Sequence, residues 1–101
     1  MNPKALRLLG LAYRAGKVAW GLEAVRSAKA RLILLADGAG NAVTREIVRL
    51  SDKTGTPVKG IPADKNALGR AIGKSVCAVV SVNDEGFAKS IALALEEAQT
   101  V

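Results

Sequence analysis

Three consecutive residues in the second half of the chain, Gly73-Lys74-Ser75, resemble the end of a phosphate-binding loop. Such a loop needs four residues between its two glycines, follows a strand and opens a helix. Only three residues separate Gly69 from Gly73, and the surrounding pattern predicts a helix before the motif and a strand after it. The sequence therefore favours a helix that ends at Gly73 with an exposed Lys74. A nucleotide-binding enzyme is the weakest of three functional hypotheses.

Two neighbouring carboxylates, Asp84 and Glu85, stand at the start of the last predicted helix, where an acid–base site is conceivable. Acidic residues at a helix N-terminus also satisfy free backbone amides and complement the helix dipole, and we favour this interpretation. The chain contains no histidine and a single cysteine. This composition excludes His-based catalysis and His-ligated metals, and it argues against zinc. We therefore expect no enzyme, no metal and no cofactor.

The first 31 residues carry seven lysines and arginines but one acidic residue, Glu23, whereas the remaining residues hold eight charges of each sign. The net charge of +6 therefore belongs to this segment. Lys17 and Gly21 delimit a loop that leads into a predicted helix, with Arg14 and Arg26 close by in the sequence. Amides at a helix start, the helix dipole and nearby cations together suit a phosphate group. The segment indicates a polyanion such as RNA or DNA, with an ordinary basic surface as the alternative.

The chain has three aromatic residues, Tyr13, Trp20 and Phe87, which are too few for a platform that stacks single-stranded bases. Any nucleic acid should therefore be recognised through its backbone and shape. No apolar run approaches the roughly eighteen residues of a membrane span, and the N-terminus does not resemble a signal peptide. We expect a cytoplasmic monomer without membrane contact, in which Cys77 is a buried structural thiol.

Helical and strand patterns alternate along the chain and must position these residues. Helices are predicted to start at Asn2-Pro3, Gly21, Asn41, Asp64 and Asn83-Asp84, and strands to cover Lys17–Ala19, Leu32–Ala36, Val58–Ile61 and Val76–Val82. Asn41 is expected to cap the third helix, and the second helix is expected to extend to Lys29. The alternation predicts an α/β fold, a three-layer α/β/α sandwich of about four strands, with residues 1–101 as a single domain.

Three segments, LLGLAYRAGKVAWG, AKARLILLADGA and LGRAIGKSVCAVVSVNDEGFAKSI, follow one another over nearly the entire chain. They resemble the bacterial, YlxQ-type branch of the L-seven-Ae/L-thirty-e superfamily of ribosomal proteins, whose members bind kink-turn RNA. The resemblance implies a three-layer sandwich with a mixed four-stranded sheet, a cytoplasmic location and no catalysis. It also implies structured RNA as the partner, ribosomal or of another kink-turn type, and makes the ribosome a candidate partner.

Family members hold the kink-turn with the first loop, the start of the second helix and the loop before the last helix. Carried over residue by residue, the resemblance implies RNA contacts by Lys17, Trp20, Gly21, Leu22, Glu23 and Arg26, and by Val82, Asn83, Asp84, Glu85, Gly86 and Phe87. Asp37 matches a frequently acidic family position near the same edge, and Arg14 is added from the basic segment.

The chain departs from the family signature Gly-x-Asn-Glu-x-x-Lys, because it reads GLEAVR from Gly21 to Arg26 and lacks the Asn. The second helix is also about one turn shorter than in relatives, and Arg26 is the candidate replacement for the family's Lys, since Arg also binds phosphate. Contacts to bases determine which RNA sequence is selected, whereas contacts to phosphates fix the position of the protein on the RNA. Glu23 is therefore expected to govern selectivity, and Arg14, Lys17 and Arg26 affinity. The alternative function is a protein-interaction or ribosome-assembly module that keeps the fold but has lost kink-turn recognition.

Overall fold

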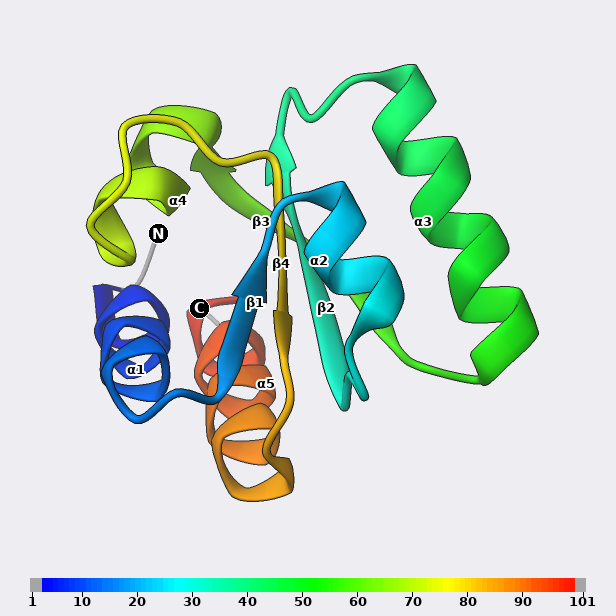
Figure 1. Ribbon diagram of the computed structural model, residues 1–101. Helices are drawn as coiled ribbons and strands as arrows, with labels where there is room; N and C mark the ends of the chain where they lie inside the picture. Colours follow the sequence, from blue (N-terminus) through cyan, green and yellow to red (C-terminus); the bar gives the residue numbers. More distant parts are fainter. Residues whose placement is uncertain (1–2, 100–101) are drawn as a thin grey trace.

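The computed structural model describes residues 3–99, so the predicted cap Asn2 lies outside the described residues. Within this range, helices and strands alternate in the predicted order (Figure 1). The helices are α1 (Pro3–Arg14), α2 (Leu22–Ser27), α3 (Asn41–Thr54), α4 (Lys65–Ala71) and α5 (Glu85–Gln99). The strands are β1 (Val18–Trp20), β2 (Leu32–Asp37), β3 (Val58–Asp64) and β4 (Val79–Val82).

The four strands form one mixed sheet in the order β1-β4-β2-β3. Strand β4 pairs antiparallel with both β1 and β2, while β2 and β3 are parallel. Trp20 at the end of β1 pairs with Val80, and Leu35 near the end of β2 pairs with Val79. The ends of β1 and β2 therefore lie at the same edge of the sheet as the start of β4.

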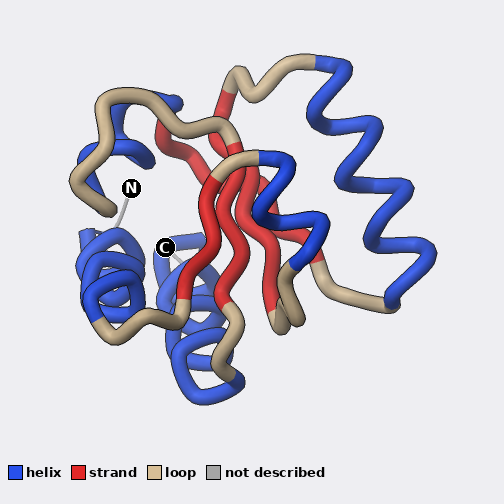
Figure 2. Tube along the Cα trace, viewed as in Figure 1, coloured by secondary structure: helices blue, strands red, loops and turns tan. Residues whose placement is uncertain are grey.

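Helices cover both faces of the sheet (Figure 2). Successive residues of β2 point to opposite faces, as expected for a strand. Leu32 and Leu34 pack with residues of α1, α4 and α5, whereas Ile33 and Leu35 pack with α2 and α3. The predicted three-layer α/β/α sandwich is therefore confirmed. No helix in the described part of the chain is long and apolar enough to cross a membrane.

Several element boundaries differ from the sequence-based prediction. Strand β3 continues to Asp64 instead of ending at Ile61, and β1 covers Val18–Trp20 instead of Lys17–Ala19. Helix α2 ends at Ser27 instead of Lys29, because the chain must turn back so that the Arg31 N–H can donate to the carbonyl of Val82. Strand β4 begins at Val79 instead of Val76. Residues 76–78, which were predicted to belong to this strand, lie in the loop between α4 and β4.

The caps of two helices test the capping predictions. The Asp64 carboxylate accepts a hydrogen bond from the Ala67 N–H at 2.8 Å, which confirms Asp64 as the cap of α4. Asn41 does not cap α3: Gly40 occupies the cap position, and Asn41 is the first helical residue. Gly40 has φ +97°, a backbone conformation that an asparagine side chain would strain, so the chain places glycine there.

Cys77 is buried, as predicted. Burial raises the pKa of its thiol, and backbone hydrogen bonds from Val79 and Gly21 partly oppose this shift. The Sγ also donates to the Val79 carbonyl at 3.2 Å. A buried thiol with a raised pKa is a poor nucleophile, which agrees with a structural role.

Candidate nucleic-acid interface

The turn between β1 and α2 consists of Gly21 alone, and it fixes the position of Trp20 and the first residues of α2. Gly21 has φ +88° and ψ 152°, a combination that residues with a side chain rarely adopt, and its N–H donates to the Val79 carbonyl at 3.0 Å. This bond ties the turn to the start of β4. Trp20 stays 42% exposed, and the Glu23 side chain is 93% exposed.

A second segment, the loop between α4 and β4, reaches the same edge of the sheet. The Lys74 Nζ lies 4.6 Å from the centre of the Trp20 ring and 5.9 Å from that of Tyr13. The loop is anchored to the sheet edge because the Ala36 N–H donates to the Ala78 carbonyl at 2.9 Å. Lys74 therefore brings the α4–β4 loop against the residues that precede α2.

We call this group of residues the Trp20 surface. It consists of Trp20, Gly21, Leu22, Glu23 and Lys74. Lys74 was not among the predicted site residues, because the sequence showed it only within a degenerate phosphate-binding motif. The structure confirms that α4 ends before Gly73 and that β4 follows, the reverse of the order in such a loop. No spacing in the sequence indicates the contact between Lys74 and Trp20, since it depends on how β1 pairs with β4.

Arg26, predicted to bind phosphate, has two acidic partners in the structure. Its Nη2 donates to the Glu46 carboxylate on α3 at 2.8 Å, and its Nη1 lies 3.6 Å from Glu23. A phosphate would have to compete with these carboxylates. Helix α2 has only six residues, so its dipole offers less attraction to an anion than a helix reaching Lys29 would.

The predicted segment before the last helix lies at the other end of β1. Val82 pairs with Val18, and the Asn83 N–H donates to the carbonyl of Lys17 at 2.8 Å. Figure 1 shows the start of α5 at the bottom of the sheet and the β1–α2 turn near its top. Of the predicted residues that precede or begin α2, Lys17 is therefore the one beside this segment.

The polar groups of this segment have local partners. The Asp84 carboxylate accepts from the Phe87 N–H at 2.9 Å, which supports the capping interpretation, and Asn83 accepts from the Ser81 hydroxyl at 2.9 Å. Glu85 pairs with a lysine one turn later, and the half-buried Phe87 packs against the core. The structure does not join the residues Val82, Asn83, Asp84, Glu85, Gly86 and Phe87 to the Trp20 surface.

The remaining predicted residues divide between the two ends. Asp37 is exposed at the end of β2, at the same sheet edge as the Trp20 surface. Arg14 and Lys17 are exposed, and neither forms a salt bridge with another of the described residues. Among residues 3–99, no group of three or more Cys, Asp or Glu side chains could hold a metal ion.

Sequence and structure comparisons agree on the relatives of this chain. The profile of the ribosomal protein L7Ae/L30e/S12e/Gadd45 family matches residues 4–92. The RNA-binding protein YlxQ of Bacillus subtilis (strain 168) is 36% identical over 88 residues, which cover 83% of this chain and 87% of the relative.

Two solved structures are similar to this one. A Bacillus halodurans C protein of unknown function superposes with a TM-score of 0.86 at 34% identity, covering 92% of this chain and 97% of the other. The 15.5kD RNA binding protein of Giardia lamblia has a TM-score of 0.72 at 23% identity, covering 95% and 85%, and it shows a shared fold. The chain belongs to the ribosomal protein L7Ae/L30e/S12e/Gadd45 family.

Proposed function

We propose that this protein is a non-enzymatic RNA-binding protein that holds structured RNA of the kink-turn type on the Trp20 surface. Family membership and the similarity to the RNA-binding protein YlxQ support RNA as the partner. The RNA-binding proteins of this family are not enzymes. The proposal includes a monomeric protein in the cytoplasm and a ribosomal or similarly structured RNA as its ligand.

The observation that carries the proposal is the meeting of the β1–α2 turn and the α4–β4 loop, with Lys74 held against Trp20. An exposed indole offers a flat face to a base that has left its stack. The Lys74 ammonium is attracted to phosphate, and the Glu23 carboxylate accepts hydrogen bonds from base amino groups. A kinked RNA that exposes unstacked bases beside a duplex stem presents all three kinds of group.

Gel shifts with two RNAs of equal length and composition, a kink-turn and a straight duplex, test the proposal. We expect a preference for the kink-turn of about tenfold or more at physiological salt, since a good base contact contributes about 1–3 kcal/mol of discrimination. Glu23→Gln should remove most of this preference with little change in affinity for the straight duplex.

Glu85→Gln is the matched control, because Glu85 is exposed on another helix at the far end of β1. Equal affinity of the wild-type protein for both RNAs would contradict kink-turn recognition. That result would favour the alternative, a protein-interaction or ribosome-assembly module of the same fold.

A further inference from the structure

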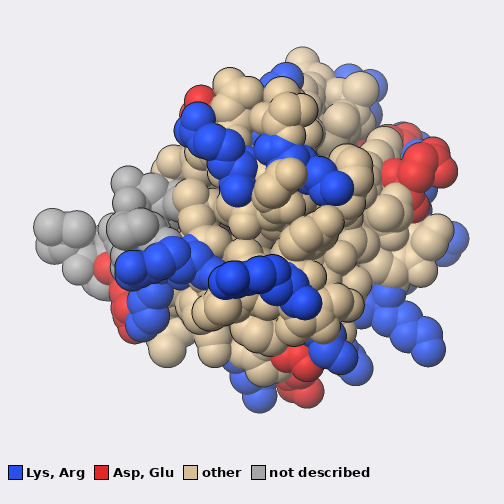
Figure 3. Space-filling view, turned by 60° about the vertical axis from the view of Figure 1, so that its left-hand side comes forward, with Lys and Arg blue, Asp and Glu red and all other residues tan. Residues whose placement is uncertain are grey.

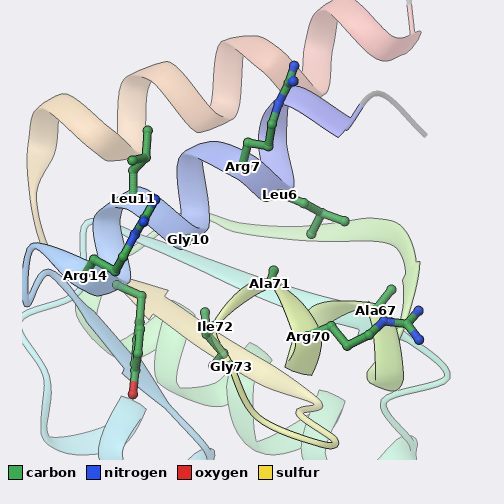
Figure 4. A pocket seen from close by; sticks show the side chains of 11 residues that line it. Leu6, Arg7, Gly10, Leu11, Arg14, Ala67, Arg70, Ala71, Ile72 and Gly73 are labelled. Carbon is green, nitrogen blue, oxygen red and sulfur yellow. The ribbon is translucent and has the colours of Figure 1, made fainter.

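A groove of about 780 Å³ runs between α1 and α4, and none of the residues of the Trp20 surface lines it. Leu6 and Ala71 point into the gap between the two helices, and Arg7, Arg14 and Arg70 extend outward from its borders (Figure 4). We call these three arginines and the groove between them the α1–α4 face.

All the charged side chains of the α1–α4 face are basic. Arg7, Arg14 and Arg70 are exposed, none forms a salt bridge with another described residue, and no acidic side chain lines the groove. Figure 3 shows this side of the molecule, with Lys and Arg gathered in two groups on either side of a neutral strip and acidic side chains near the margins. Unpaired cations on both sides of one groove attract a polyanion.

The spacing of these cations is fixed by the helices that carry them. Arg7 and Arg14 lie seven residues apart, which is two helical turns or about 10 Å along one side of α1. Between them, Gly10 brings α1 close to α4: a Cβ at this position would lie 2.9 Å from the carbonyl oxygen of Ala71. Arg70 is therefore held across a narrow groove from the arginines of α1.

The α1–α4 face is continuous with the Trp20 surface. Tyr13 lines one end of the groove, and its ring contacts Lys74, which in turn contacts Trp20. A partner bound at the Trp20 surface can therefore extend past Lys74 and Tyr13 to the arginines of the groove.

The lining of the groove indicates how that partner would be held. Apart from the arginines and Tyr13, it consists of Leu, Ala, Ile and Gly residues. These apolar side chains donate and accept no hydrogen bonds, so the floor of the groove offers base edges no partner. The arginines remain available for phosphates, and such contacts position a nucleic acid without reading its sequence.

We propose that the α1–α4 face is a second RNA-binding surface, which holds the phosphate backbone of a duplex stem that extends from the Trp20 surface. This inference rests on the proposed RNA-binding function and adds a sequence-independent contact to it.

The test compares two triple variants that lose the same charge. Arg7→Ala/Arg14→Ala/Arg70→Ala removes the cations of the α1–α4 face. Arg45→Ala/Arg49→Ala/Lys53→Ala removes three cations from α3 on the other side of the sheet. The probes are a kink-turn RNA with a stem of about 12 base pairs and the same RNA with this stem cut to about three. Thermal unfolding followed by circular dichroism verifies that both variants are folded.

On the long-stem RNA we expect the α1–α4 variant to bind on the order of 10- to 100-fold more weakly than wild type at 0.15 M salt. Its slope of log affinity against log salt should be shallower by about 2 to 3, since each phosphate contact contributes about 0.7 to 0.9. The α3 variant should stay close to wild type. On the short-stem RNA both variants should bind like wild type, and the base sequence of the stem should have no effect.

Equal losses in the two triple variants would overturn the inference, because they would reflect net charge alone. Unchanged RNA binding by the α1–α4 variant would also overturn it and would point to an acidic protein as the partner of this face. Failure of the proposed kink-turn recognition would give a different result. In that case the wild-type protein itself would show no preference between the kink-turn and the straight duplex.

Discussion

Lys74 connects three elements that are distant in the sequence. Its ammonium contacts the rings of Tyr13 at the end of α1 and Trp20 at the end of β1, while its backbone belongs to the α4–β4 loop. A cation–π contact at an exposed site contributes about 0.5–1 kcal/mol. This is a small part of the stability of a domain, so the main effect of the contact is to fix the orientation of the indole and the loop.

Lys74→Ala should therefore change the RNA site more than the fold. Trp20 is the only tryptophan in the chain, so its fluorescence reports on this position alone. We expect an altered Trp20 emission spectrum in the free variant and an RNA affinity several-fold lower. The melting temperature should fall by no more than about 8 °C, the shift that corresponds to about 1 kcal/mol in a domain of this size.

Lys89→Ala is the control, since Lys89 pairs with Glu85 on α5 at the other end of β1. An unchanged emission spectrum together with wild-type RNA affinity in Lys74→Ala would contradict the role given to Lys74.

The predictability of individual residues depended on whether their partners are local. The cap of α4 was predicted because Asp64 and the amide it accepts from are three residues apart. The partner of Arg26 was not, because Glu46 lies on another helix and the two meet only when α2 and α3 pack on the same face of the sheet. The contact between Lys74 and Trp20 was missed for the same reason.

At the scale of elements, the number, order and type were predictable and some ends were not. The buried run of β2 indicated a central strand, and the pairing of β2 with both neighbours confirms it. The apolar run from Val76 to Val82 looked uniform, but Val76 is 52% exposed and the Cys77 N–H donates to the Lys65 carbonyl. The end of a strand depends on how far the adjacent strands of the sheet extend. The pattern of apolar residues within one segment does not contain that information.

The positions of the predicted RNA-contact residues also depend on how the strands pair. The residue pattern located the start of α2 to within one residue, yet the structure separates the Val82–Phe87 segment from it by the length of β1. The antiparallel register of β1 and β4 decides which loops share an edge of the sheet. It therefore brings the α4–β4 loop to the Trp20 surface.

The packing of α1 against α4 depends on Gly10, where a Cβ would clash with the Ala71 backbone. Gly10→Ala should force these helices apart and lower the free energy of unfolding by roughly 1–3 kcal/mol, as overpacking does in other cores. Urea unfolding with an unchanged m-value would measure this loss. Gly60→Ala is the control, because a Cβ there meets no atom within 4 Å and its φ is not positive. Equal stability of the two variants would show that Gly10 does not set the distance between the helices.

At the scale of the whole molecule, folding brings Arg7 and Arg14, from the basic first 31 residues, to the same side as cations from later in the chain. Arg70 from α4 and Lys74 from the following loop lie on the same side as α1. The charge asymmetry seen in the sequence thus becomes a continuous surface from the arginines of α1 to Trp20. Of the cations outside it, Arg26 and Arg49 pair with acidic residues.

This distribution predicts the salt dependence of RNA binding by the wild-type protein. Arg7, Arg14, Lys17, Arg70 and Lys74 are the cations that we assign to phosphate contacts, because each lies on this side or next to it and none has a salt-bridge partner among the described residues. With about 0.7 to 0.9 per contact, the slope of log affinity against log salt should lie between about −3.5 and −4.5. Filter binding of the long-stem kink-turn RNA from roughly 50 to 400 mM salt measures it. A slope near −1 would mean that most of these cations do not touch RNA, and the basic surface would then serve another purpose.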